Sequence, residues 1–113
     1  MKIMVKEIEN ITVMAISGRI DSISSDDLET AIKKSLDMNS KIIIDLKDTE
    51  YVSSSGLRVL LAGLKSLKTK NGYMILISLQ PVVRDVFEIT GLARLFSIHN
   101  NLDDAINSMQ SKR

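Results

Sequence analysis

The sequence has no cysteine and no tryptophan, a single histidine, and only two tyrosines and two phenylalanines among its 113 residues. The lack of cysteine excludes disulfides and thiolate chemistry, and one histidine leaves little from which to build a metal site. So few aromatic side chains do not support the base-stacking platform that binds single-stranded nucleic acid. We therefore expect no metal, no cofactor and no nucleic-acid partner.

An excess of charge of one sign and long apolar runs are also absent. The chain carries 15 Lys and Arg against 14 Asp and Glu, so no long-range field favours a nucleic acid or an anionic membrane. No apolar run approaches the roughly 20 residues that cross a bilayer, and MKIMVKEIEN at the N-terminus lacks the apolar core of a signal peptide. We expect a cytoplasmic protein with a single domain over residues 1–113.

Short apolar runs of two kinds alternate along the chain. Runs rich in β-branched residues predict strands, whereas apolar residues at i, i+3 and i+4 predict helices. The expected strands are residues 2–8, 11–17, 41–46, 73–78 and 95–98, and the expected helices are residues 24–38, 54–68, 81–89 and 102–109. The resulting order, ββαβαβαβα, is typical of the α/β fold class with a mostly parallel or mixed sheet of four to five strands.

This topology also predicts where a functional site lies. Residues 41–46, KIIIDL, are expected to form the central strand, because continuous apolar strands are covered on both faces. Right-handed crossovers make successive strands parallel, so the loops that leave them lie along one edge of the sheet. Sites in such sheets lie beyond the carboxyl ends of the strands. Residues 18–21, 47–55 and 79–80 should therefore converge there.

Three serines, Ser53, Ser54 and Ser55, precede a helix at this edge. A helix N-cap, worth about 1 kcal/mol, needs only Ser53 or Ser54. The glycines of a G-x-S-x-G hydrolase turn and of a Walker phosphate loop are absent, and His99 is expected to end the last strand. A hydroxyl at a helix start can also accept a phosphate, which the exposed N–H groups there would bind. Capping and phosphorylation both stay open on these grounds.

Four segments, in order and with matching spacing, resemble the STAS domain family and, within it, the stand-alone anti-sigma factor antagonists. They are GRID at 18–21, IIIDL at 42–46, YVSSSGL at 51–57 and FEITGLARLF at 87–96. The resemblance covers nearly the whole chain and implies the STAS fold, with about four helices packed largely on one face of the sheet.

The function that this resemblance implies is a phosphorylation switch. Family members bind an anti-sigma factor that is also a serine kinase, and thereby release the sigma factor. The kinase phosphorylates a serine of the antagonist, which ends the binding, and a PP2C-type phosphatase reverses the reaction. Aligned with the family motif Asp-Ser-Ser/Thr-Gly-Leu, Ser54 is the implied phosphoacceptor, with Ser55 or Ser53 as alternatives. Asp21 matches the loop aspartate that is important for the encounter with the kinase.

The partner-binding surface is expected on residues 18–25 and 54–65, and the protein is expected to be a monomer or a weak dimer. Its predicted residues are Asp21, Ser22, Ser24, Ser53, Ser55, Gly56 and Arg58.

One departure from the family pattern supports a second hypothesis. Ser53 stands where the family usually has aspartate, which removes a charge at the helix start. The alternative is a STAS module without phosphate control, serving a stressosome-like scaffold or a lipid-transport complex. An enzyme is not expected, because too few acid–base groups converge on the predicted edge. Asp45 is expected to end its strand and accept backbone hydrogen bonds from the next turn.

Overall fold

The computed structural model describes residues 1–111, which form one six-stranded sheet and four α-helices. The strands are β1 (Lys2–Ile8), β2 (Ile11–Ile20), β3 (Lys41–Asp45), β4 (Thr49–Val52), β5 (Tyr73–Ile77) and β6 (Ser97–His99). The helices are α1 (Ser25–Met38), α2 (Ser54–Thr69), α3 (Pro81–Ile89) and α4 (Leu102–Gln110), with a 3-10 turn at Leu92–Arg94. The α/β fold class and the predicted order are confirmed, with β4 as an addition.

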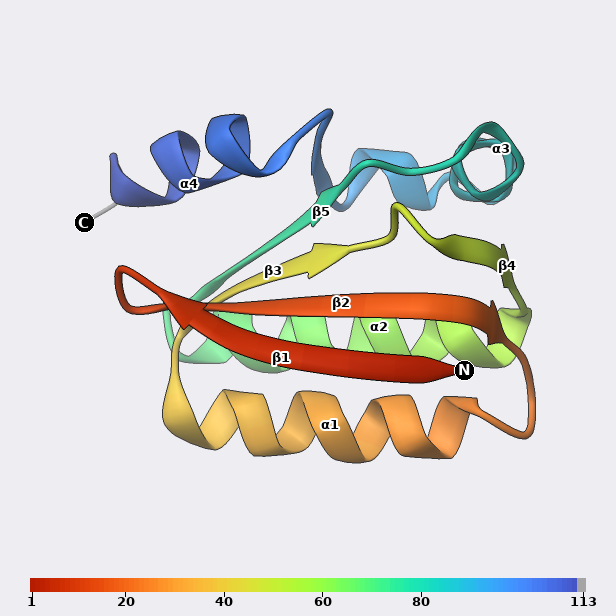
Figure 1. Cartoon of the computed structure of the whole chain (residues 1–113), viewed down its shortest axis with the longest axis horizontal. Helices are drawn as coiled ribbons and strands as arrows, with labels where there is room; N and C mark the ends of the chain where they lie inside the picture. Colours follow the sequence, from red (N-terminus) through yellow and green to blue (C-terminus); the bar gives the residue numbers. More distant parts are fainter. Residues whose placement is uncertain (112–113) are drawn as a thin grey trace.

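The sheet is mixed and has β3 near its centre, as predicted. Its strand order is β1-β2-β3-β5-β6, and β4 pairs with β2 beyond the end of β3. β1 and β2 form the predicted antiparallel hairpin, whereas β2, β3, β5 and β6 run parallel to one another. The carboxyl ends of β2, β3 and β5 therefore lie on the same edge of the sheet (Figure 1).

Two stretches predicted as loops instead contain strand. β2 continues to Ile20, and β4 forms within residues 47–55, so that Arg19 lies opposite Tyr51 and Ile20 opposite Val52. A strand of four residues is stable only beside a partner strand, and the sequence does not reveal that pairing. The register shifts at Gly18, whose φ of +95° is in the left-handed region.

The last strand also begins later than predicted, at Ser97 rather than at residue 95. Phe96 turns into the core instead, where its ring meets Phe87 edge to face with the centroids 5.5 Å apart. Burial of two aromatic rings outweighs the small gain from two more residues of strand.

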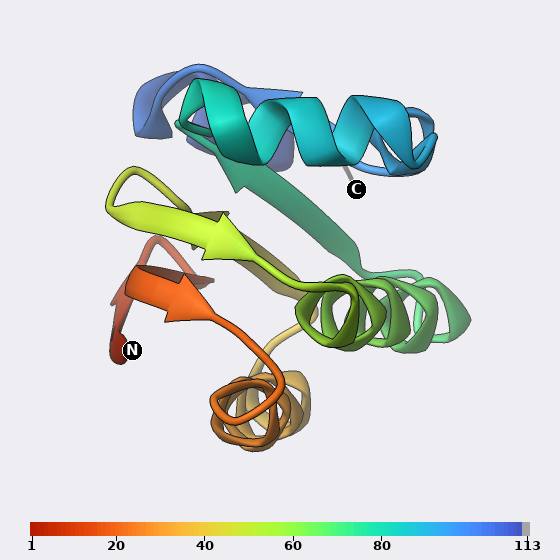
Figure 2. The same ribbon diagram turned by 90° about the vertical axis from the view of Figure 1, so that its right-hand side faces the viewer.

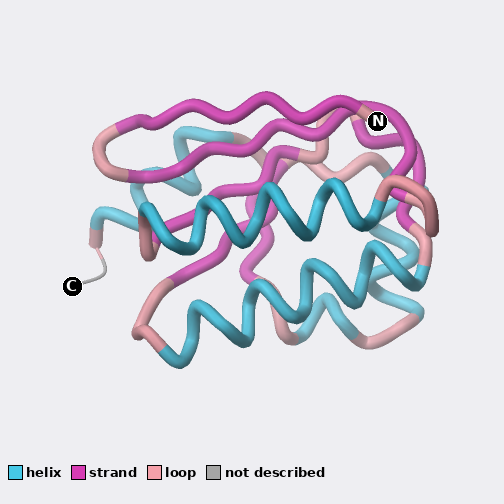
Figure 3. Tube along the Cα trace, turned by 90° about the horizontal axis from the view of Figure 1, so that it is seen from below, coloured by secondary structure: helices cyan, strands magenta, loops and turns pink. Residues whose placement is uncertain are grey.

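The helices cover the two faces of the sheet unequally. Helices α1, α2 and α3 contribute to the larger hydrophobic core, together with Met14, Ile16, Ile42 and Ile44 of the sheet. Helix α4 packs on the opposite face, over a smaller cluster that contains Ile43 and Ile75. Figure 3 shows α1 and α2 side by side, and Figure 1 shows α4 across the sheet from them. The predicted arrangement, with helices largely on one face, is confirmed.

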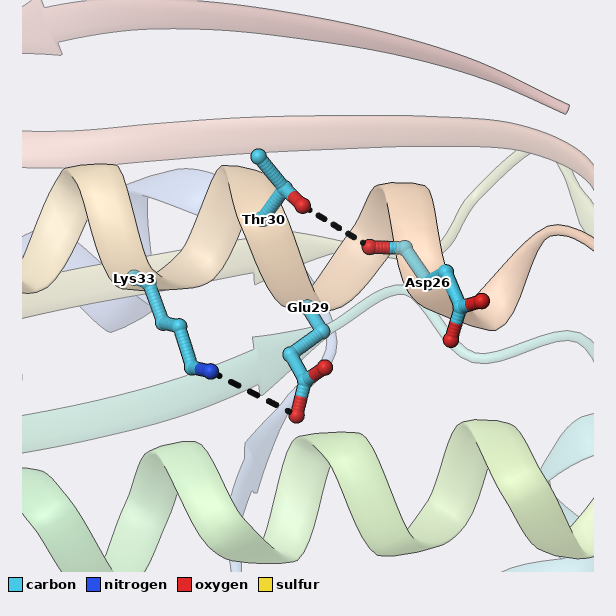
Figure 4. Close-up of polar contacts among 4 residues, drawn as sticks. All are labelled: Asp26, Glu29, Thr30 and Lys33. Carbon is cyan, nitrogen blue, oxygen red and sulfur yellow. Dashed lines mark hydrogen bonds and ion pairs between the residues drawn. The ribbon is translucent and has the colours of Figure 1, made fainter.

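The outer face of α1 is polar and stabilised by local contacts. Lys33 Nζ lies 3.8 Å from Glu29 Oε2, and Thr30 Oγ1 donates to the Asp26 carbonyl at 3.1 Å (Figure 4). An exposed pair at i, i+4 contributes only about 0.3–0.5 kcal/mol. Burial of the apolar face therefore holds α1 on the sheet. No helix within residues 1–111 is both long and apolar enough to cross a membrane.

The loops at the carboxyl edge converge as predicted. The Gly18 N–H donates to the Asp48 carbonyl at 2.9 Å, and Gln80 Nε2 donates to the Lys47 carbonyl at 2.7 Å. Asp45 ends β3, and its Oδ1 accepts the Lys47 N–H at 2.9 Å. This confirms the structural role predicted for Asp45. Figure 2 shows this edge, with the beginnings of α1 and α2 facing the viewer.

Candidate functional site

The loop between β2 and α1 is held in one shape by Asp21 and Ser24. Asp21 Oδ1 accepts the N–H groups of Ile23 at 3.0 Å and of Ser24 at 2.9 Å. The Ser24 hydroxyl accepts the Asp21 N–H at 2.9 Å, and it lies 3.1 Å from Asp21 Oδ1 and 2.9 Å from the Arg19 carbonyl. Ser24 is the N-cap residue of α1, but its hydroxyl caps no helical N–H because the loop uses it.

The hydrogen bonds from Ser24, its backbone N–H first, lower the pKa of Asp21 below the ordinary value of 3.8. These bonds favour the ionised carboxylate of Asp21. They therefore stabilise the folded protein at any pH above the ordinary pKa, and this stabilisation is lost as the pH falls through the lowered pKa of the folded state. In an NMR titration, the amide signals of Ile23 and Ser24 should move together with a midpoint below 3.8. The Ser24→Ala variant should raise that midpoint, and a wild-type midpoint above 3.8 would contradict this account of the loop.

The three serines at the start of α2 have different surroundings. Ser53 is the N-cap: its Oγ accepts the Gly56 N–H at 3.2 Å, and its own N–H donates to the Ile20 carbonyl at 2.8 Å. Ser55 is half-buried, whereas Ser54 is exposed. Within residues 1–111 the Ser54 hydroxyl takes part in no hydrogen bond. Ser53 therefore serves the fold, and Ser54 faces solvent.

Gly56 brings the start of α2 against the end of β2. A Cβ at this buried position would lie 2.6 Å from Ile20 Cγ2 and 3.1 Å from Val52 Cγ1. Ile20 directly precedes Asp21 in the chain, so this close contact sets Ser54 beside the Asp21 loop. Gly56, predicted among the partner-binding residues, is buried and acts in the site by positioning α2.

The remaining predicted positions lie on the surface of the same edge. Ser22 is exposed in the Asp21 loop, and Arg58 is exposed on α2 four residues after Ser54. Residues four apart on a helix lie on the same side, one turn from each other. The edge therefore carries a carboxylate, a serine hydroxyl and a guanidinium on two adjoining segments, the Asp21 loop and the first turns of α2.

Two residues within the predicted segments of this edge were not named as site residues. The Arg19 guanidinium lies over the ring of Tyr51, 4.4 Å from its centroid, and the two residues are paired across β2 and β4. Such a contact is worth about 0.5–1 kcal/mol at an exposed site. Arg19 lies two residues before Asp21, and Tyr51 lies two residues before Ser53. Residues two apart in a strand point to the same face of the sheet, so the strand period places each of the two beside a residue that was named as part of the site. The pairing of β4 with β2 could not be predicted.

His99 is separated from the serines by most of the sheet. It ends β6, as predicted, whereas β4 leads into the serines and pairs with β2. β4 lies beside β2 beyond the end of β3, two strand spacings, about 10 Å, from β6, and within residues 1–111 the His99 side chain shares no hydrogen bond with these serines. Together with the exposure of Ser54, this separation leaves no Ser–His pair. No group of three or more His, Cys, Asp or Glu side chains within residues 1–111 is arranged to hold a metal ion.

The site is an open surface. A hollow of about 570 Å³ lies nearby, and its lining includes Gly18, Asp48 and Glu50 but neither Asp21 nor any of the three serines at 53–55. Small-molecule sites are concave and bury most of their ligand, whereas an exposed loop beside an exposed helix start suits a protein partner.

Comparison with known proteins agrees with the fold and the motifs. A family model described as the STAS domain matches residues 2–105. The chain belongs to the STAS domain family. The resemblance seen in the sequence is thereby confirmed.

Similar proteins are described as anti-sigma factor antagonists. BtrV of Bordetella bronchiseptica, which carries that description provisionally, is 32% identical over 106 residues, covering 93% of this chain and 91% of BtrV. The crystal structure of an anti-sigma factor antagonist from Mycobacterium paratuberculosis is 29% identical, with a TM-score of 0.88 and coverage of 96% of this chain and 93% of that one. The Bacillus cell fate determinant SpoIIAA in its phosphorylated form shares the fold, with a TM-score of 0.73 at 20% identity, covering 95% of this chain and 98% of SpoIIAA.

Proposed function

We propose that this STAS protein is an anti-sigma factor antagonist of the cytoplasm. Its unphosphorylated form binds a serine-kinase anti-sigma factor and so releases the sigma factor, and phosphorylation of Ser54 ends that binding. The observation that carries the proposal is the exposed Ser54, beside the loop that Asp21 holds in shape. The similarity to proteins described as anti-sigma factor antagonists supports the same function.

The surroundings of the three serines favour Ser54 as the phosphoacceptor. A phosphate on Ser53 would esterify the oxygen that accepts the Gly56 N–H, so the existing cap, worth about 1 kcal/mol, would have to rearrange. Ser55 is half-buried, so a kinase would reach its hydroxyl less readily. Phosphorylation of Ser54 disturbs no hydrogen bond found among residues 1–111.

A phosphate on Ser54 would change the surface without unfolding the protein. It adds about −1.5 to −2 charges at the start of α2, where exposed N–H groups and the helix dipole tolerate an anion. The lowered pKa of Asp21 keeps that neighbouring side chain negative as well. A partner that docks on a surface with one carboxylate would then have to desolvate a second anion, which is costly without a second counter-ion. The reaction itself needs no catalytic residue of this chain, because the partner is the kinase.

The proposal is tested by incubating the purified protein with ATP and each kinase-type anti-sigma factor encoded in the same genome. Tandem mass spectrometry should find one phosphate, on Ser54, that is lost in the Ser54→Ala variant and retained in Ser53→Ala. A PP2C-type phosphatase should remove it. Phosphate on Ser53 or Ser55 instead would contradict the choice of Ser54. A folded protein that no kinase phosphorylates would favour the alternative, a STAS scaffold or accessory subunit without phosphate control.

A further inference from the structure

Ile23 is a large apolar side chain that the structure leaves in solvent. It is 85% exposed, in the loop between β2 and α1. Isolated exposed apolar residues are common on protein surfaces and need no special explanation. Ile23 differs from such residues because its loop is held in shape and adjoins the proposed phosphorylation site.

The backbone around Ile23 is fixed by hydrogen bonds on both sides. Its own N–H donates to Asp21 Oδ1 at 3.0 Å, and the next N–H, that of Ser24, donates to the same oxygen at 2.9 Å. A β-branched side chain also has few rotamers to lose. An anchor that is already ordered loses little conformational entropy on binding, so it contributes more to affinity than a mobile side chain of the same size.

Ile23 also lies within the proposed docking surface. It lies between Ser22 and Ser24, and its loop meets the start of α2 through the 2.8 Å hydrogen bond from the Ser53 N–H to the Ile20 carbonyl. Binding energy at protein interfaces is concentrated in a few central side chains that polar residues surround. Here the surrounding groups are hydroxyls and the Asp21 carboxylate.

Asp21 indicates the chemistry of the complementary surface. Its Oδ1 accepts the hydrogen bonds of the loop, whereas its Oδ2 takes part in none found within residues 1–111. An ionised carboxylate with one oxygen that makes no hydrogen bond inside the protein can accept hydrogen bonds from Lys or Arg of a partner. The complementary surface therefore combines an apolar pocket with a basic side chain at its border.

We infer that Ile23 is the apolar anchor by which this protein docks its anti-sigma factor, entering a pocket that a basic residue borders. This inference rests on the proposed function. Ile23 lies outside the segments that resemble the family, and it supplies a main share of the affinity. Asp21 sets the orientation of the partner through the basic residue.

The test compares binding of the wild type and of Ile23 variants to the anti-sigma factor by isothermal titration calorimetry. Ile23→Ala should weaken binding at least about 10-fold, as truncation of an interface anchor does. Ile23→Val, which keeps a β-branched apolar side chain, should retain most of the affinity. The matched control is Met38→Ala, since Met38 is 81% exposed at the far end of α1 and its truncation should leave binding unchanged.

Thermal unfolding and kinase kinetics distinguish a loss of docking from a loss of folding and from a change in the phosphorylation step. Ile23→Ala should unfold at the same temperature as the wild type, because the side chain has almost no packing to lose. It should raise the KM of the kinase for this protein about 10-fold and leave kcat unchanged. The lost contact is made equally in the ground state and in the transition state, so only binding is weakened. Equal affinities of Ile23→Ala and the wild type would overturn the inference and leave the proposed function intact. A wild type that binds no kinase-type anti-sigma factor would overturn both.

Discussion

The Ser54→Asp variant is expected to bind the anti-sigma factor at least about 100-fold more weakly than the wild type. Aspartate places a permanent negative charge at the start of α2, close to the loop in which Asp21 is kept ionised. The partner must then desolvate this additional charge, which the one basic side chain that faces Asp21 does not neutralise. Ser54→Ala carries no charge and should bind as tightly as the unphosphorylated wild type, but phosphorylation should no longer release it.

The matched control is Ser66→Asp, which makes the same change of charge at another exposed serine of α2. Twelve residues of helix, about 18 Å, separate it from Ser54. Binding can be measured by calorimetry, with circular dichroism to verify that each variant is folded. Undiminished affinity of Ser54→Asp would show that a charge at this position does not control docking, and the switch hypothesis would be abandoned.

The Gly56→Ala variant is expected to lose both stability and partner binding. Its Cβ would lie 2.6 Å from Ile20 Cγ2, an atom of a fully buried, β-branched side chain that has no room to turn away. Overpacking of this kind costs about 1–3 kcal/mol, which corresponds to a fall in unfolding temperature of roughly 4–8 °C per kcal/mol for a domain of this size. The first turn of α2 must also move away from β2, which separates Ser54 from the Asp21 loop.

Gly91→Ala is the control for Gly56→Ala. A Cβ at Gly91 would meet no atom within 4 Å, although the φ of +78° makes any side chain there strained. The variant should therefore lose about 1–2 kcal/mol of stability and keep its affinity for the partner. Thermal unfolding and calorimetric titration of both variants provide the comparison. If Gly56→Ala kept the wild-type affinity, close packing of α2 on Ile20 would not be needed to assemble the site.

Most elements of the fold could be predicted from the sequence because their signals are local. The apolar run of β3 and the leucines of α2 repeat at the periods of their own elements. The central position of β3 could also be predicted, since a continuous apolar strand is covered on both faces. The extension of β2 and the short β4 could not be predicted, because each depends on hydrogen bonds to residues about 30 positions away in the chain.

The place of the candidate site in the fold could be predicted, whereas the roles of its residues stay predictions. The motifs drew attention to the Asp21 loop and to the serine row, and the structure places both at the carboxyl edge of the sheet. The hydrogen bonds of Ser53 and Asp21 are local. The contacts across the edge could not be predicted, because the Arg19–Tyr51 contact and the packing of Gly56 on Ile20 join β2 to β4 and α2. The exposure of Ile23 was likewise invisible, since an isoleucine in a sequence is expected to be buried.

The sequence by itself determined the α/β class, the order of the elements and the family, because hydrophobic periodicity and motif spacing are properties of the chain alone. The tertiary structure decided which hydroxyl among three adjacent serines faces solvent and which apolar side chain stands outside the core. Both depend on which surfaces the folded chain covers. A neighbour tens of residues away, such as Ile20 against Gly56, fixes the orientation of α2, and that orientation exposes Ser54.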